Sequence, residues 1–328
     1  MASATPLATP HPSSPSSGTS TPNVTNLKPT TPSNIAPATS IAAANHASTP
    51  SPSAPRRGNW LSHVRDDISL THADWPLLVS CLVSGLCDSV AFNATGTFAS
   101  MQTGNTIFLA LGAASLPPNQ PLLWLRALVS ISSFWAGCLF FSRAFKTHHP
   151  RPLQKLTLFL SFALQAALVL AAAVLAQTGA VPAFSQSRLQ PTLDAAAEHA
   201  RFDRENESVT LAPLALLAFG FGGQIVASRV LGFVEVPTNV LTSLYCDLLS
   251  DPGLAAGVGR NEKRDRRVVA IVMMLGGGVV GGWMQRSAAG MAGALWLAAG
   301  IKMGLAGAWL GWRSKEVVVG GEGGKGDV

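Results

Sequence analysis

The same pattern occurs twice in this chain, as GLCDSVAFNATGTFASMQTGN at residues 85–105 and as GGQIVASRVLGFVEVPTNVLTS at residues 222–243. In each stretch a mainly apolar segment carries a polar side chain, Asp88 or Gln224, eight residues before a glycine. A short segment of mixed polar and apolar residues follows. Because glycine often terminates helices, the pattern predicts a helix, a break and a short polar segment at both places.

The composition around these stretches is that of an integral membrane protein. Of the 328 residues, 48% are hydrophobic and only 12% are charged, whereas about a quarter of the residues of a soluble domain are charged. We expect an all-α, polytopic helix bundle in which each full span has about 20 predominantly apolar residues. The six predicted spans are 76–95, 122–145, 153–176, 211–231, 266–286 and 289–312.

Two further apolar stretches, 98–116 and 233–250, are interrupted by polar residues, so each is either another span or a re-entrant segment. The distribution of Lys and Arg favours the second interpretation. With six spans, the basic loops 143–155 and 251–267 lie on one side of the membrane together with both termini, and the positive-inside rule makes that side cytoplasmic. With eight spans, loop 143–155 would violate this rule. Six spans plus two re-entrant segments is therefore the preferred topology.

Three spans in each half would give the two halves opposite orientations. The sequence thus predicts an inverted repeat, with 76–176 as the first membrane repeat, 211–315 as the second and 177–210 as an extramembrane loop. Inverted repeats with broken segments are the architecture of many secondary transporters. The alternative is that the two stretches look alike only because all membrane segments share an apolar composition.

The remaining segments are polar. Residues 1–58 are rich in Pro, Ser and Thr and are expected to be a disordered tail, because they cannot bury enough apolar surface to offset chain entropy. Residues 59–75 are predicted to form a short interfacial helix, and 316–328 a C-terminal tail. Asn206 lies in an Asn-Glu-Ser tripeptide of the extramembrane loop and is a possible N-glycosylation site.

The repeated motifs resemble the YoaK-type membrane proteins, the family of domain of unknown function 1275. The family pattern G-x-x-D-A corresponds to GLCDS at 85–89, and M-T-G-N corresponds to QTGN at 102–105. In the second half, L-G-x-V-E-V-P-T corresponds to LGFVEVPT at 231–238. The resemblance covers about 75–315 and implies a multi-pass membrane protein with no settled substrate. The long tail and the extended extramembrane loop resemble a fungal version of the family.

Several positions depart from the family pattern; one is the second Thr-Gly, which is Thr242-Ser243 here. Gln102 replaces the methionine that precedes Thr-Gly-Asn, and Ile225 replaces the asparagine that follows Gln224. These departures leave the membership intact, because the paired motifs on both halves are specific.

Polar side chains inside apolar segments are costly in lipid and therefore mark candidate functional positions. Asp88 is a candidate for an ion- or proton-coupled role; the alternative is a structural role, either as a partner of Lys302 or as a cap at the break. Lys302 requires a polar cavity or an acidic partner, for which Asp88 is preferred over Asp247. The candidate residues of a solute or ion pathway are Asp88, Gln102, Thr103, Gly104, Asn105, Gln224, Glu235, Thr238, Asn239, Thr242 and Lys302.

Glycines in the last two predicted spans are spaced for close helix contact, as in small-xxx-small packing. They are Gly276, Gly277, Gly278, Gly281, Gly282, Gly293, Gly300, Gly304, Gly307 and Gly311.

Several functional classes are disfavoured. All seven histidines lie outside the predicted spans, Gly-x-Ser-x-Gly is absent, and the four cysteines include no CxxC, so we expect no catalytic residue, no metal and no cofactor. The basic residues form short clusters beside apolar stretches rather than a nucleic-acid-binding patch. The expected partners are the lipid bilayer and a small polar solute or ion. The favoured function is secondary transport of such a solute; the alternative is a membrane scaffold or sensor, and an intramembrane enzyme is the least favoured.

Overall fold

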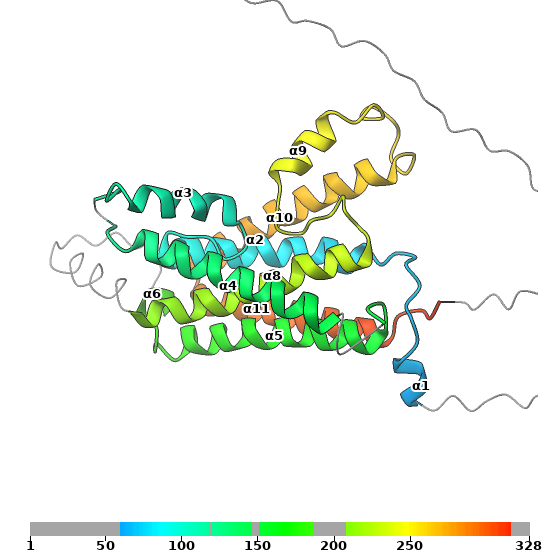
Figure 1. Ribbon diagram of the computed structural model, residues 1–328, viewed down its shortest axis with the longest axis horizontal. Coiled ribbons are helices and arrows are strands. Elements are labelled where there is room, and N and C mark those ends of the chain that lie inside the picture. Colours follow the sequence, from blue (N-terminus) through cyan, green and yellow to red (C-terminus); the bar gives the residue numbers. More distant parts are fainter. Residues whose placement is uncertain (1–59, 119, 146–150, 186–207, 316–328) are drawn as a thin grey trace, which may run out of the picture. The chain divides into compact units, whose positions relative to one another are not determined.

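The computed structural model describes residues 60–118, 120–145, 151–185 and 208–315, which are helical with short connections (Figure 1). Six helices are long and apolar enough to cross a membrane, which confirms the predicted helix bundle. They are α2 (Trp75–Thr95), α4 (Leu123–Arg143), α5 (Lys155–Gln177), α8 (Leu211–Leu231), α10 (Glu262–Arg286) and α11 (Gly290–Leu310). The predictions for 1–58, Asn206 and 316–328 lie outside the described residues.

The shorter helices occupy the connections. They are α1 (Trp60–Val64), α3 (Gln102–Gly112), α6 (Pro182–Ser185), the 3-10 helix η2 (Ser208–Thr210) and α9 (Thr242–Leu249). With 11 and 8 residues, α3 and α9 are too short to span a bilayer. Figure 1 shows α3 ending at the end of the bundle where α2 ends, and α9 running back toward the end where α8 terminates. Both paths are those of re-entrant segments.

Five of the six spans begin and end within two residues of the predicted positions. The exception is α10, which begins at Glu262 instead of 266. The side-chain oxygen of Asn261 accepts a hydrogen bond from the backbone N–H of Arg264 (3.1 Å) and caps the helix. The cap adds one charged turn that hydropathy alone does not assign to a span.

The interfacial helix predicted at 59–75 was wrong in its length. Only α1 is helical there, and the segment around Ile68 is extended across the ends of two spans. The backbone N–H of Ile68 donates to the carbonyl of Leu153 (2.9 Å), and that of Ser69 donates to the carbonyl of Arg313 (2.8 Å). These backbone groups find partners at the start of α5 and the end of α11, so the segment gains more from bridging the two helices than from coiling on itself.

The two halves of the bundle follow the same plan. Gly96 ends α2 with φ +73° and Gly232 ends α8 with φ +82°, both in the left-handed conformation that glycine adopts without a steric penalty. After each glycine comes an irregular segment, a short helix and two spans. We call the irregular segments the first break (residues 96–101) and the second break (residues 232–241).

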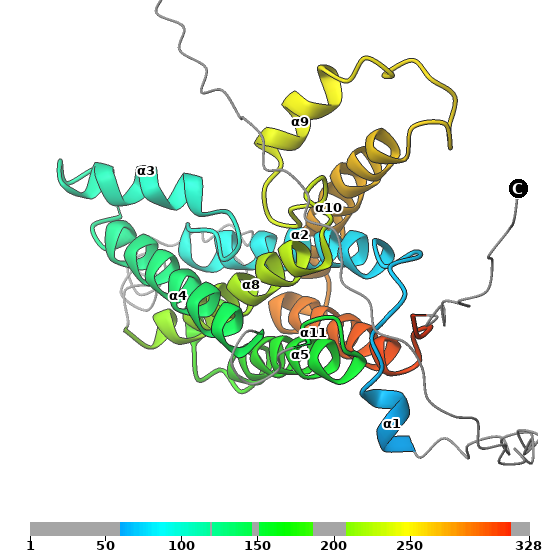
Figure 2. The same cartoon turned by 45° about the vertical axis from the view of Figure 1, so that its right-hand side comes forward.

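The helices pair between the halves. The most extensive contacts are those of α2 with α10, α4 with α8, and α5 with α11 (Figures 1 and 2). In the repeat, α2, α4 and α5 of the first half correspond to α8, α10 and α11 of the second. Under this correspondence the α2–α10 pair becomes the α8–α4 pair, and the α5–α11 pair is unchanged. This is the contact pattern of an inverted 3+3 repeat, with α5 and α11 on its axis.

Glycines make the two related crossings close. Gly85 and Gly277 lie where α2 crosses α10, and Gly222 and Gly137 lie where α8 crosses α4. A Cβ atom at any of these four positions would overlap the backbone of the partner helix. Glycine is thus required here for the helix backbones to approach.

The prediction that all the glycines of α10 and α11 mediate packing was wrong for several of them. A Cβ atom on these glycines would meet nothing within 4 Å, because they face away from the neighbouring helices of the described structure. They are Gly276, Gly282, Gly300, Gly304 and Gly307.

Candidate functional site

A polar layer divides the interior of the bundle. The buried apolar side chains form two clusters. On each of three helices, one polar residue lies between the residues of the first cluster and those of the second. These residues are Gln165 on α5, Gln224 on α8 and Lys302 on α11, each no more than 1% exposed. Because all three lie near the middle of their helices, the layer is placed close to the bilayer centre.

Lys302 is the charged group of this layer. Its Nζ donates to Oε1 of Gln165 (2.7 Å) and to Oε1 of Gln224, and it lies 5.3 Å from the centroid of the Phe162 ring. Within the described part of the chain, no carboxylate forms an ion pair with it. The predicted pairing of Lys302 with Asp88 was therefore wrong, because two neutral amide oxygens occupy the positions that a carboxylate would take.

The second break joins the polar layer through Asn239. The Nε2 atom of Gln224 donates to Oδ1 of Asn239 (2.8 Å) and to Oγ of Ser84 on α2 (2.7 Å). Asn239 in turn donates to the carbonyl of Phe221 (3.0 Å) and accepts from Oγ of Thr238 (3.0 Å). The structure thus brings Gln224, Thr238, Asn239 and Lys302 into one connected network.

Asp88 holds the first break. Its Oδ1 accepts from the backbone N–H groups of Ala99 and Ser100 (2.8 Å each), and its Oδ2 accepts from the hydroxyl of Ser100 (2.5 Å). Asp88 is only 4% exposed. The carboxylate supplies hydrogen-bond acceptors for backbone N–H groups that the break leaves without helical partners in the membrane. Of the alternatives raised by the sequence, the structure therefore shows the capping arrangement.

Asn105 closes the first break on itself. Its side chain donates to the carbonyl of Phe98 (2.6 Å) and accepts from the N–H of the same residue (3.0 Å). It also donates to Oε1 of Gln102 (2.9 Å) and to Oγ of Ser130 on α4 (3.0 Å). Gln102 and Asn105 therefore belong to a second, separate network that anchors α3 to α4.

The other candidate residues lie away from both networks. Thr103 and Thr242 are exposed on the short helices, and Gly104 packs against the ring of Phe98. Glu235 forms an ion pair with Arg266 (3.0 Å). The same guanidinium binds Asp74 (2.8 Å), so Glu235 helps to fasten the second break at the end of the bundle.

A cavity of about 520 Å³ lies between the two breaks. Asp88, Phe98 and Met101 line it from the first half, and Leu241 and Tyr245 line it from the second break and α9. Most of its wall is apolar, because both oxygens of Asp88 are engaged by the first break. The pocket that both breaks border is thus open and largely apolar.

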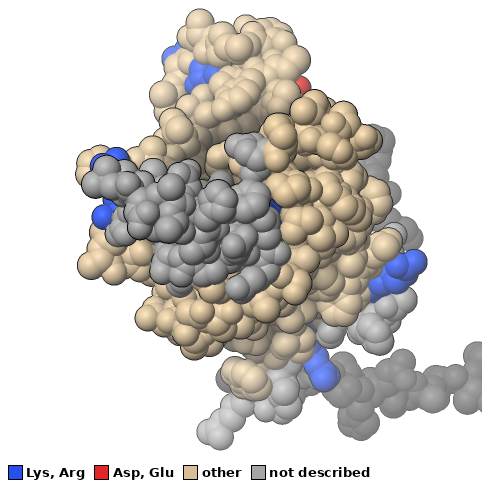
Figure 3. Space-filling model, turned by 90° about the vertical axis from the view of Figure 1, so that its left-hand side faces the viewer, with Lys and Arg blue, Asp and Glu red and all other residues tan. Residues whose placement is uncertain are grey.

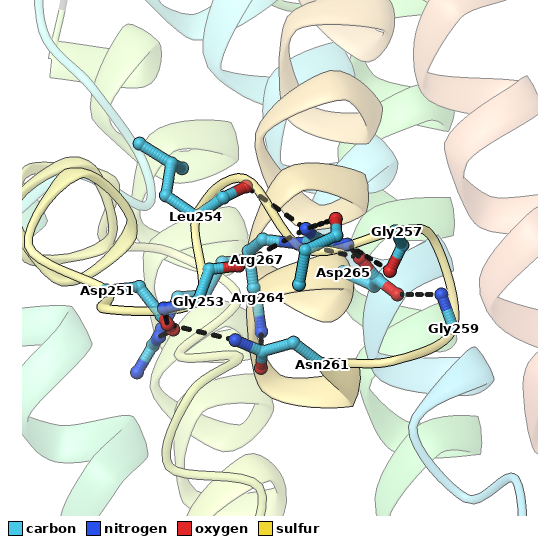
Figure 4. Close-up of polar contacts among 10 residues, drawn as sticks. Asp251, Gly253, Leu254, Gly257, Gly259, Asn261, Arg264, Asp265 and Arg267 are labelled. Atoms are coloured by element: carbon cyan, nitrogen blue, oxygen red, sulfur yellow. Dashed lines mark hydrogen bonds and ion pairs between the residues drawn. The ribbon is translucent and has the colours of Figure 1, made fainter.

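The connection from α9 to α10 is organised by Arg264 (Figure 4). Its guanidinium donates to several carbonyls, including those of Leu254 (3.1 Å) and Gly257 (3.2 Å), and pairs with Asp265. Asp251 accepts from the N–H of Gly253 (2.8 Å). These contacts give the connection a defined shape that sets the position of α9 relative to α10.

The charged side chains are distributed unevenly between the ends of the bundle. At one end lie the end of α4 and the beginnings of α5 and α10, with Arg143, Lys155 and Arg266. We call this the basic end. Figure 3 shows the opposite end, where most of the described surface is uncharged and the Lys and Arg atoms in view lie mainly toward its edges. This asymmetry is the one that membrane proteins show between their two sides.

Among the residues that the structure describes, no three His, Cys, Asp or Glu side chains gather as a metal-ligand set.

Fold and site together define a multi-pass membrane protein with two related halves, two broken segments and a polar layer between them. The family described as "Protein of unknown function (DUF1275)" matches residues 77–308, and the chain belongs to this family, as its motifs predicted. No curated protein and no solved structure matches the chain significantly.

Sequence reasoning missed several residues of the networks. Gln165 is a lone amide in the middle of a predicted span, so the signal that singled out Asp88 was present for it too. Ser84 and Ser130 carry no such signal, because serine commonly bonds the carbonyl of its own helix one turn earlier. Only their positions opposite Asn239 and Asn105 give them a role.

Proposed function

We propose that this protein is a secondary transporter of a small polar or ionic solute. The observation that carries the proposal is the polar layer at the bundle centre, where the second break, α2, α5, α8 and α11 meet at Lys302 and Gln224. Buried polar groups at this depth are costly, and a solute pathway gives a reason for placing them there.

The two breaks support the same proposal. Each half enters the membrane with a short segment from its own end, and both segments are attached to α2, at Ser84 and at Asp88. In transporters with inverted repeats, broken segments of this kind meet near the midplane and open alternately to the two sides. The cavity between the breaks provides space next to this junction.

The helix pairs supply a route for alternation. Arg266 and Asp74 join α10 to α2 at the basic end, while Gln285 and Asn93 join the same helices toward the other end (2.6 Å). The α2–α10 pair is thus fastened at both ends and can move as one body against the α5–α11 pair. Such rocking of one unit against another is the usual mechanism of alternating access.

Osmotic swelling of liposomes that contain the purified full-length protein tests the proposal. The panel consists of glycerol, urea, choline chloride, sodium chloride and sodium butyrate. We expect at least one solute to enter at least tenfold faster than it enters protein-free liposomes, and Gln224→Leu, which breaks the polar layer, to abolish the excess. Gly282→Leu on the open face of α10 is the matched control that keeps it. Entry of no solute above the protein-free rate would refute the proposal.

A further inference from the structure

Lys302 has an unused donor. An ammonium group has three N–H bonds, and two of them point to the amide oxygens of Gln165 and Gln224. No third hydrogen-bond acceptor for this group is found among the described residues, and the centroid of the Phe162 ring lies 5.3 Å from it. Among the described residues, no carboxylate forms an ion pair with Lys302.

A second buried donor lies on the same helix. Trp309 is 0% exposed, and its indole Nε1 has no hydrogen-bond partner among the described residues. It is two turns beyond Lys302 on the same face of α11, and its ring packs against Phe162 at 5.6 Å. Phe162 therefore lies between the ammonium and the indole. Unsatisfied buried donors are rare and call for an absent partner.

An acceptor that carries a negative charge suits both groups. Both free groups are donors, and the two amide oxygens of the layer are already occupied by Lys302. A single ammonium balances one charge, so a monovalent anion fits and a dianion does not. The Phe162 ring beside the ammonium is apolar and favours an anion with an organic body over a strongly hydrated inorganic ion.

We infer that the polar layer binds a small organic monocarboxylate through the Lys302 ammonium, and that the Phe162–Trp309 pair lines its path toward the basic end. This inference rests on the proposed transport function for its physiological meaning, but binding itself does not require transport. The carboxylate would accept the free N–H of Lys302, and the indole N–H of Trp309 would receive it on the way.

The binding test uses the full-length protein in detergent and sodium butyrate as the probe. A ligand that binds only the folded state raises the unfolding temperature, and this rise grows with the ligand concentration. We expect butyrate to raise it relative to sodium chloride at equal ionic strength. The apparent affinity should fall at least tenfold in Lys302→Met and be retained in Lys302→Arg, which keeps the charge. If Lys302→Met does not fold, Lys302→Gln replaces it.

Tryptophan variants supply an independent comparison. Trp309→Phe removes the free indole donor but keeps a ring, and we expect it to weaken butyrate binding severalfold without lowering the stability of the free protein. Trp312→Phe is the matched control, because the Trp312 indole already donates to the carbonyl of Ser69 (3.0 Å). It should leave butyrate binding unchanged.

The outcomes separate this inference from the transport proposal. Lys302-dependent binding of butyrate without any solute flux supports the inference and removes transport. Flux of glycerol, urea or choline without binding of butyrate keeps transport and overturns the inference. Equal stabilisation by chloride and butyrate, or butyrate binding that is unchanged in both neutral Lys302 variants, also overturns it.

Discussion

Ser84 and Asp88 lie one helical turn apart on α2, and each holds a different broken segment. The hydroxyl of Ser84 contacts Oδ1 of Asn239 (3.3 Å) in the second break, while Asp88 binds the backbone of Ala99 and Ser100 in the first. Two segments that belong to opposite halves of the chain therefore meet on neighbouring turns of one helix. Helix α2 is thus hydrogen-bonded to both breaks.

The capping role of Asp88 can be separated from a charge-carrying role. Asp88→Ala leaves two buried backbone N–H groups without acceptors, at a cost of about 1–3 kcal/mol each, and we expect a clear fall in thermal stability in detergent. Asp88→Asn keeps one oxygen for both N–H groups and should be milder. Thr103→Ala, at an exposed position, is the control. Equal stability of all three variants would contradict the capping role.

The close crossing of α2 and α10 predicts a sharp contrast between adjacent glycines. Gly277→Leu places a side chain against the backbone of Leu82 and should prevent correct folding, because neither backbone can yield. Gly276→Leu points into open space and should leave a monodisperse protein. Gel filtration of the two variants in detergent makes the comparison. Similar behaviour of both would show that the helices do not cross here.

The ion pairs of Arg266 predict a local loosening of the second break. Arg266→Gln removes the shared partner of Asp74 and Glu235, and hydrogen bonds to charged groups contribute about 1.5–3 kcal/mol. We expect hydrogen exchange over residues 232–241 to become at least tenfold faster. The control Arg267→Gln loses its contact with Asp251 instead (3.0 Å) and should leave these residues unchanged. If residues 232–241 exchange at the same rate in both variants, Arg266 does not hold this break in place.

Asp251 makes the connection between α9 and α10 sensitive to acid. The backbone N–H of Gly253 is the main cause that lowers the pKa of this carboxyl; burial opposes it, and Asn261 and Arg267 add to it. A lowered pKa in the folded state means that the stabilisation is complete above the usual Asp pKa of about 4 and is lost as the pH falls through the folded-state value.

Hydrogen exchange over residues 250–254, corrected for its intrinsic pH dependence, should therefore rise on acidification. Asp265, whose pKa is also lowered, binds the N–H of Gly259 outside this stretch. Asp251→Asn keeps an acceptor but does not titrate, so the rise should disappear in this variant. A rise of the same size in Asp251→Asn would assign the effect to other groups.

The uneven charge predicts the orientation in the membrane. With the basic end in the cytoplasm, cysteines placed at Ser250 and Thr178 should react with a membrane-impermeant maleimide from opposite sides. Both positions are exposed and lie at opposite ends of the bundle. The background for this test replaces Cys138 and Cys246, the two native cysteines that are not buried. Labelling of both positions from the same side would exclude the six-span topology.

Much of the fold followed from local properties of the chain. A run of about 20 apolar residues has to form a helix in lipid, so the spans could be located within two residues except where Asn261 caps α10. The breaks at Gly96 and Gly232 were equally local, because only the glycine conformation was needed to end the helices there. The segment around Ile68 could not be assigned in this way, since its partners come from the ends of α5 and α11.

The candidate site was predicted in part. The cost of polar groups in lipid marked Asp88, Gln224, Asn239 and Lys302, and the structure places three of the four in one network. The same rule could not say which charge faces which partner. Asp88 and Lys302 looked complementary by charge alone, but their neighbours across the bundle satisfy them separately.

By itself the sequence determined that this is a membrane protein, where its helices run and where they break, and it predicted two related halves. These properties depend on hydropathy, glycine and short motifs, all of which act along the chain. Only the tertiary structure decided that Gln165 and Gln224, rather than Asp88, surround Lys302, and that Gly277 packs while Gly276 does not. The reason is physical: a partner across a helix interface depends on the rotation and pairing of whole helices, which the pattern within a single helix does not contain.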